Sequence, residues 1–202
     1  MQRLNAPTFF DQAIPVSGLD AVKRNALLVL LGSILLAISA KAQYALWPVP
    51  ITMQTLVLMI IGATFGWRLA GLTVLAYWAQ GLAGLPVFAY GGGAAYFFGG
   101  NATAGFLWGF LPAAMFIGAA AQWGMARNPI MLAGAMLVAH VILYIPGLAW
   151  GYIYSQPISV TADDGLLAKF LEPFVIGDLI KIAIAVIVVP LAYKAVESFK
   201  KG

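Results

Sequence analysis

An aspartate and a lysine stand out because they lie within an otherwise apolar stretch near the end of the 202-residue chain. Asp178 and Lys181 follow Val-Ile-Gly, and the apolar run Ile182–Val189 comes directly after them. Their i,i+3 spacing places them on one face of a helix. Because ionisable groups in such a stretch are costly and usually face an interior cavity, we expect the pair to bind a ligand. An ion pair that only neutralises itself, or joins two helices, is the alternative.

The chemistry of this pair indicates the kind of ligand. A carboxylate accepts hydrogen bonds from N–H groups, and an ammonium donates to carbonyl or carboxylate oxygens. The implied ligand is therefore small and amphiphilic, with adjacent donor and acceptor groups. A bare metal ion fits poorly beside Lys181, and a sequence with no cysteine and one histidine, His140, lacks the residues of a histidine or thiolate metal site.

Gln54 and His140 are further polar residues within apolar stretches. Gln54 could reach a ligand or could equally well bond a helix end. His140 is more typical of a hydrogen-bond partner between two helices than of a ligand-binding group. Both interpretations of Gln54 stay open on the sequence alone.

The composition places these residues in a membrane protein. Hydrophobic residues make up 62% of the chain, charged residues 9%, and the mean hydropathy is +0.92. Soluble domains are about 45–50% apolar and about 25% charged, so a soluble globular fold is excluded. Apolar runs predict an all-α membrane protein with six transmembrane helices: Asn25–Ala42, Ile51–Trp67, Leu69–Leu85, Ala104–Met125, Pro129–Tyr152 and Pro173–Ala195. Residues 1–24 form an N-terminal cytoplasmic segment, 25–195 the transmembrane substrate-binding domain and 196–202 a cytoplasmic tail.

The basic residues gather on one side of these predicted spans. With the N-terminus in the cytoplasm, only Lys41 and Lys169 fall in outer segments, whereas the inner side carries Arg3, Lys23, Arg24, Arg68, Arg127, Lys194, Lys200 and Lys201. The positive-inside rule therefore predicts that both termini are cytoplasmic. The net charge of +4 needs no nucleic acid to explain it, because basic residues beside a lipid bilayer account for most of it.

The loop of residues 86–103 carries no charge and is rich in glycine and aromatic residues. Such a loop is a poor solvated loop, so we expect it to fold over an apolar site as a lid, with Phe88 and Tyr90 among its contact residues. Asn101 is its one strongly polar side chain. The first outer loop, with Tyr44 and Trp47, has a similar character, and an interfacial aromatic belt would explain it equally well.

The first predicted span carries a stripe of small residues. Ser33, Ala37 and Ala40 follow i, i+4, i+7 spacing, which lets another helix approach closely. That helix could belong to the same chain or to a partner protein.

Four separated motifs together resemble a known family. They are Val49–Leu56 (VPITMQTL), Gly81–Ala89 (GLAGLPVFA), Thr103–Phe110 (TAGFLWGF) and the pair Asp178 and Lys181. In this order they resemble the BioY family, the biotin-specific substrate-binding (S) components of energy-coupling factor (ECF) transporters. The resemblance runs from about Asn25 to Ala195. One departure is Asn101-Ala102-Thr103, where the family commonly has Gly-Pro-Thr.

The resemblance implies an S-component fold with a ligand pocket on the outer side and biotin as the transported ligand, without a cofactor or catalysis. Asp178 would accept a ureido N–H, Lys181 would donate to the ureido carbonyl or the tail carboxylate, and Asn101 would add a hydrogen bond. Aromatic rings of the lid would pack on the biotin bicycle.

The resemblance also implies partners in a bacterial or archaeal cytoplasmic membrane: a transmembrane coupling protein of the EcfT type and two cytoplasmic ABC ATPases. The stripe of Ser33, Ala37 and Ala40 would dock on the coupling protein. The sequence itself has no P-loop motif, so ATP hydrolysis must come from another chain. A rival interpretation is a proton-coupled secondary transporter of a vitamin-like amphiphile, in which Asp178 takes up and releases the proton.

Overall fold

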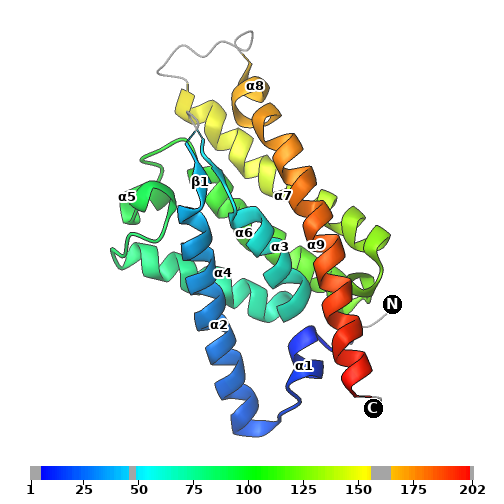
Figure 1. The fold of residues 1–202 in the computed structure, drawn as a ribbon. Coiled ribbons are helices and arrows are strands. Elements are labelled where there is room, and N and C mark those ends of the chain that lie inside the picture. The colour runs from blue at the N-terminus through cyan, green and yellow to red at the C-terminus, as the bar shows by residue number, and fades with distance from the viewer. Residues whose placement is uncertain (1–5, 46–48, 156–164, 201–202) are drawn as a thin grey trace.

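The computed structural model describes residues 6–45, 49–155 and 165–200, and within them helices dominate (Figure 1). The longer helices are α2 (Gly18–Lys41), α3 (Gln54–Phe65), α4 (Trp67–Leu82), α6 (Ala104–Gln122), α7 (Pro129–Ser155) and α9 (Glu172–Phe199). Shorter elements join them: α1 (Phe9–Ala13), β1 (Gln43–Tyr44), β2 (Ile51–Thr52), η1 (Ala89–Gly91), α5 (Ala94–Phe97), η2 (Met125–Arg127) and α8 (Leu166–Phe170).

The predicted spans correspond to the longer helices, but several boundaries differ. The second span is shorter than predicted, because Ile51 and Thr52 pair with β1 in an antiparallel hairpin and the helix begins only at Gln54. Helix α2 begins at Gly18, within the predicted N-terminal segment, and α9 continues past the predicted end at Ala195. Arg3, Trp47 and Lys201 lie outside the described residues.

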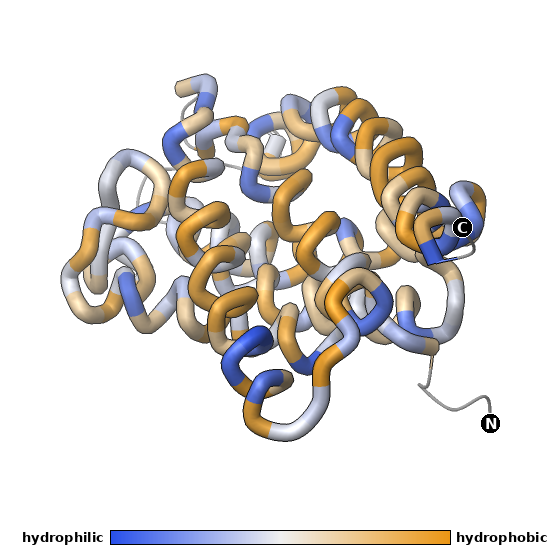
Figure 2. Tube along the Cα trace, turned by 60° about the horizontal axis from the view of Figure 1, so that its bottom comes forward, coloured by the Kyte–Doolittle hydropathy of each residue, from blue (hydrophilic) through white to orange (hydrophobic). Residues whose placement is uncertain are grey.

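Four helices in the described part of the chain are long and apolar enough to cross a membrane: α2, α6, α7 and α9, the last taken together with α8. Figure 2 shows that hydrophobic residues extend along most of the long helices. Large apolar side chains on their outer faces are exposed, Ile130 and Ile176 among them, as expected for surfaces that contact lipid. At 12 residues, α3 is about 18 Å long, which is less than the thickness of the hydrocarbon core.

Helices α6 and α7 pack closely because two glycines of α6 face α7. A Cβ atom at Gly105 would lie 2.2 Å from the carbonyl oxygen of Pro146, and one at Gly109 would lie 2.7 Å from the carbonyl oxygen of Leu143. Their spacing is that of the G-x-x-x-G motif, which allows two helix backbones to approach. The sequence contains this signal in addition to the stripe on the first span.

The small-residue stripe of α2 faces the interior of the chain. Ser33 and Ala40 are fully buried and Ala37 is half-buried. Ser33 accepts a 2.7 Å hydrogen bond from Nε2 of Gln80 on α4. In this structure the stripe therefore packs within the chain, and its role in docking a partner stays a prediction.

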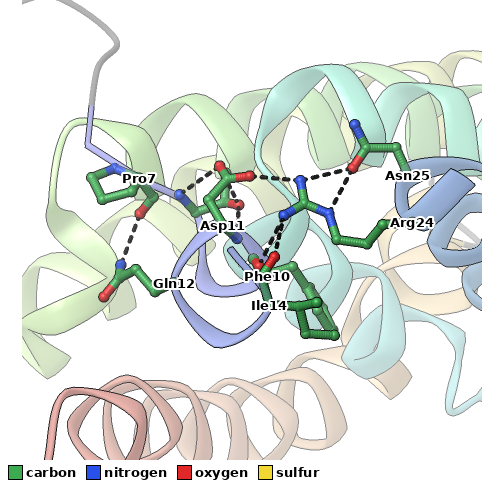
Figure 3. Close-up of polar contacts among 8 residues, drawn as sticks. Pro7, Phe10, Asp11, Gln12, Ile14, Arg24 and Asn25 are labelled. Carbon is green, nitrogen blue, oxygen red and sulfur yellow. Dashed lines mark hydrogen bonds and ion pairs between the residues drawn. The ribbon is translucent and has the colours of Figure 1, made fainter. Parts of the chain in front are cut away.

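A clasp formed by α1 and Arg24 fixes the N-terminal segment to the start of α2 (Figure 3). The guanidinium of Arg24 donates to the carbonyl oxygens of Phe10 and Ile14, to Oδ1 of Asp11 at 2.8 Å and to Oδ1 of Asn25. Its side chain is only 11% exposed. The carbonyl of Phe10 also accepts from the backbone N–H of Ile14, whereas the bond to the carbonyl of Ile14 satisfies a group at the end of the helix that has no backbone partner among the described residues.

Helix α1, the beginning of α2 and the C-terminal part of α9 lie at the same end of the bundle, opposite β1 and α8 (Figure 1). Contacts at this end join α1, α9 and η2. The ring of Phe9 packs edge-on against Tyr193, and Arg127 pairs with Glu197 at 3.1 Å. The opposite end of the bundle holds the hairpin and the loop of residues 83–103, which surround the cavity described next.

Candidate ligand-binding site

A cavity of about 590 Å³, its open mouth included, lies at the end of the bundle that holds the hairpin and the loop. Its lining comes from the hairpin, the loop and every long helix except α2. The lining residues are Val49, Pro50, Thr52, Gln54, Thr55, Tyr77, Phe88, Ala89, Tyr96, Thr103, Phe106, Leu107, Phe110, Leu143, Tyr144, Phe174, Asp178 and Lys181.

The predicted pair of Asp178 and Lys181 lines this cavity, one helical turn apart on α9. Their charged groups lie 3.0 Å apart, between Nζ of Lys181 and Oδ1 of Asp178, and both side chains are 9% exposed. Thr55 on α3 bonds to both residues: its hydroxyl donates to Oδ1 of Asp178 at 3.2 Å and accepts from Nζ of Lys181 at 2.9 Å. The burial costs of the two charges are thus offset by pairing and by hydrogen bonds.

Two side chains of α7 approach the second carboxylate oxygen of Asp178. The hydroxyl of Tyr144 donates to Oδ2 at 2.6 Å. His140, one turn earlier, places Nε2 3.7 Å from Oδ2, while Nδ1 faces the carbonyl oxygen of Met136 at 2.9 Å. His140 is buried and does not line the cavity, so it approaches Asp178 from outside the cavity. The expected hydrogen bond to another helix is not formed, because Nε2 has no partner within hydrogen-bond distance among the described residues and only the 3.7 Å approach to Asp178 reaches α9.

Aromatic side chains form much of the cavity wall. Phe88 is fully buried, packs edge-on against Tyr77 and stacks on Tyr96 with ring centroids 5.8 Å apart. Burial raises the pKa of Tyr96 to about 12, so its hydroxyl stays neutral near pH 7. On the other side, Phe106 packs edge-on against Tyr144. The cavity therefore offers flat apolar surfaces beside one ion pair.

Gln54 lies where it could reach a ligand, and its side chain bonds a tyrosine rather than a helix end. It is buried and lines the cavity, and its Nε2 donates a 2.8 Å hydrogen bond to the hydroxyl of Tyr77. That hydroxyl in turn donates to the carbonyl oxygen of Val87 at 3.2 Å. Gln54 thus connects the cavity to the backbone of the loop.

Asn101 and Tyr90 belong to the loop but do not line the cavity. The amide of Asn101 donates to the carbonyl oxygen of Tyr96 at 2.8 Å, and its Oδ1 accepts from the backbone N–H and the hydroxyl of Thr103. It therefore shapes the turn that brings Thr103 to the cavity. Tyr90 is 55% exposed and has a left-handed backbone with φ of 54°.

Thr55 and Tyr144 are site residues that sequence reasoning missed. Thr55 is adjacent to Gln54, which was a candidate, and Tyr144 is one turn after His140. An i,i+4 pair of polar side chains in an apolar helix is a signal for a shared polar face.

No cluster of three or more His, Cys, Asp or Glu side chains suited to a metal occurs in the part of the chain that the structure describes.

The site can thus bind a small molecule with polar groups at one end and apolar surface along its length. Asp178 offers an acceptor and Lys181 a donor within one turn of helix. A family model described as the BioY family matches residues 11–198. The chain belongs to the BioY family. The resemblance inferred from the motifs is thereby confirmed.

Curated relatives agree with membership of the BioY family. The biotin transporter BioY of Rhodobacter capsulatus is 38% identical over 148 residues, which cover 67% of this chain and 74% of that protein. The probable biotin transporter BioY of Pyrococcus horikoshii is 30% identical, over 80% of this chain and 91% of its own. The biotin transporter BioY2 of Lactococcus lactis is 30% identical, with 82% and 87% covered.

A solved structure shows that this BioY-family chain has the S-component fold. It is the crystal structure of the S-component for biotin from an ECF-type ABC transporter. The TM-score is 0.63 at 20% sequence identity, and the match covers 93% of this chain and 96% of the other.

Proposed function

We propose that this chain is the biotin-binding S component of an ECF-type transporter. It captures biotin and takes part in its uptake, and it is not an enzyme. The observation that carries the proposal is the buried pair of Asp178 and Lys181 beside aromatic walls in one cavity. Its curated relatives in the BioY family carry the name biotin transporter, which supports biotin as the ligand.

The ureido ring of biotin matches the charged pair chemically. It presents N–H donors next to a carbonyl acceptor, so Asp178 accepts an N–H while Lys181 donates to the carbonyl or to the tail carboxylate. Gln54 offers an amide beside them, and Phe88 offers a flat wall for the apolar bicycle. Because Asn101 and Tyr90 do not line the cavity, we assign them an indirect role, in shaping the loop that closes it.

In the membrane, we place the cavity toward the outside and both termini in the cytoplasm. The bundle end that holds α1 and the C-terminal part of α9 also holds Arg24 and Arg127, whereas Lys41 lies at the end with the cavity. This distribution supports the orientation by the positive-inside rule. We further propose that α3 and α4 cross with the other four helices, which gives six spans in a bacterial or archaeal cytoplasmic membrane.

Uptake then requires partners that supply energy. We propose a transmembrane coupling protein of the EcfT type and two cytoplasmic ABC ATPases. Docking through Ser33, Ala37 and Ala40 would require α2 to separate from α4 or to rotate, since Ser33 is bonded to Gln80. Residues 1–24 and 196–202 flank the transmembrane substrate-binding domain of residues 25–195 in this proposal.

Equilibrium binding of biotin to the detergent-purified chain tests the proposed ligand. We expect tight binding to the wild-type protein, no binding of another vitamin such as riboflavin, and loss of biotin binding in Asp178→Asn and Lys181→Ala. A well-folded wild-type protein that does not bind biotin would overturn the proposal.

Uptake into vesicles that contain this chain without ATPases separates the S component from the proton-coupled alternative. An S component that depends on ATPases shows binding but no accumulation of biotin when a pH gradient is imposed. Accumulation driven by the gradient would instead favour proton coupling through Asp178.

A further inference from the structure

Lys41 is a cation at the end of the bundle where the positive-inside rule expects few. Its Nζ atom lies at the end of α2 and donates to two backbone carbonyl oxygens of the loop, that of Pro86 at 2.5 Å and that of Phe88 at 3.0 Å. From this geometry we infer that Lys41 is a positioning residue, which holds the aromatic wall of the binding cavity in place without contacting the ligand. The inference rests on the proposed function for its effect on biotin.

Three consecutive carbonyl groups of the loop are held by side chains from other elements. Lys41 binds those of Pro86 and Phe88, and the hydroxyl of Tyr77 on α4 binds that of Val87 between them. The described backbone gives the carbonyl groups of Pro86 and Val87 no other hydrogen bond, whereas that of Phe88 also accepts from the N–H of Gly91 at 3.1 Å. An ammonium group suits this position because it carries three donors and no acceptor.

The position of this segment determines where the ring of Phe88 lies. The ring is fully buried, and a Cβ atom at Gly81 would come within 2.1 Å of its Cζ atom. The ring therefore occupies the space that Gly81 leaves open on α4, between Tyr77 and Tyr96. With so little free space, a shift of the backbone at residue 88 displaces the cavity wall itself.

The anchoring bonds of Lys41, unlike that of Tyr77, come from outside the cavity. Lys41 is exposed and does not line the cavity, and the neighbouring side chain of Gln43 accepts a 3.4 Å hydrogen bond from the backbone N–H of Tyr90. Helix α2 and β1 thus hold the loop from one side, while the ligand contacts it from the other. Removal of the ammonium should therefore loosen the closed wall and speed ligand release, and should leave the charged pair of Asp178 and Lys181 intact.

Amide hydrogen exchange and biotin dissociation kinetics of Lys41→Met, Lys41→Arg and Lys169→Met test this inference. Lys169 is the matched control, because the sequence also places it on the outer side and its ammonium group makes no hydrogen bond or ion pair with any described residue. In Lys41→Met we expect exchange at the amides of Phe88, Gly91 and Gly92 to rise about tenfold in the ligand-free protein, and biotin to dissociate about tenfold faster. Arginine should restore both rates to within about threefold, since it supplies donors of the same charge.

Several results would overturn the inference. They are unchanged loop exchange in Lys41→Met, the same change in Lys169→Met, or no recovery in Lys41→Arg. A rise spread evenly over the amides of α6 and α7 would also overturn it, because it would indicate a general loss of stability. The exchange measurement needs no ligand, so it decides the inference even if the wild-type protein fails to bind biotin, a result that would overturn the proposed function alone.

Discussion

The hydroxyl of Tyr144 donates a 2.6 Å hydrogen bond to Oδ2 of Asp178 and so joins α7 to α9 at the cavity. The other carboxylate oxygen is held by Lys181 and Thr55. Asp178 is thus held by side chains from α7, α3 and its own helix α9. Such preorganisation lowers the cost of ordering the site when a ligand binds.

Tyr144→Phe should weaken biotin binding about tenfold, because the carboxylate loses a donor and becomes free to rotate. Isothermal titration of the purified protein measures the effect. Tyr193→Phe is the matched control, since Tyr193 also joins two helices through its hydroxyl, to the carbonyl oxygen of Ala63, but at the other end of α9. An equal loss of affinity in both variants would contradict a specific role for Tyr144.

Asp178→Asn should destabilise the protein by about 3 kcal/mol, because it leaves the ammonium of Lys181 buried without its counter-ion. The double variant Asp178→Asn with Lys181→Met should be more stable than the single variant, since neither charge remains. Thermal unfolding in detergent compares the two. A double variant that is less stable than Asp178→Asn would show that pairing is not what stabilises Lys181.

Gly81→Ala should weaken biotin binding by about tenfold or more, because the added methyl group occupies the space of the Phe88 ring. Gly134→Ala on α7 serves as the control: nothing lies within 4 Å of a Cβ atom at that position. There alanine should leave affinity unchanged and stabilise the helix by about 0.5–1 kcal/mol. Wild-type affinity in Gly81→Ala would show that the ring is free to move.

The N-terminal clasp should open in acid. Burial raises the pKa of Asp11, but hydrogen bonds from Thr8 and Arg24 outweigh burial and hold it below its usual value of 3.8. Because the pKa is lower in the folded state, the carboxylate stabilises the clasp above pH about 4, and this contribution is lost as the pH falls through the folded value. Hydrogen exchange of residues 9–13, measured down to pH 3 and corrected for the intrinsic rate, should therefore rise.

Asp11→Asn should give the fast exchange of the opened clasp already at pH 7. Asp20→Asn is its control, because Asp20 pairs with Lys23 only at 3.6 Å and is 73% exposed. Slow exchange that persists in Asp11→Asn would mean that the backbone bonds of Arg24 suffice to hold α1.

Local patterns in the sequence account for the fold class and for the central pair of the site. Helices α2, α6, α7 and α9 could be predicted from apolar runs that are long enough to cross a bilayer. Hydrophobicity over about 20 residues reflects burial in lipid and does not depend on tertiary packing. The i,i+3 spacing placed Asp178 and Lys181 on one helix face, because that relation depends only on the helical repeat. Both results follow from short-range geometry.

Only the tertiary structure decided which residues surround that pair and which way each helix face turns. Thr55 and Tyr144 form hydrogen bonds with Asp178, although they are 123 and 34 residues away from it in the sequence. The side chain of Asn101 bonds to Thr103 and does not line the cavity. The stripe of α2 likewise faces α4, and β1 and β2 pair where a longer helix was predicted. These outcomes depend on the rotation and crossing of helices that are apolar on nearly every face, and the periodicity of such helices does not single out one face for burial.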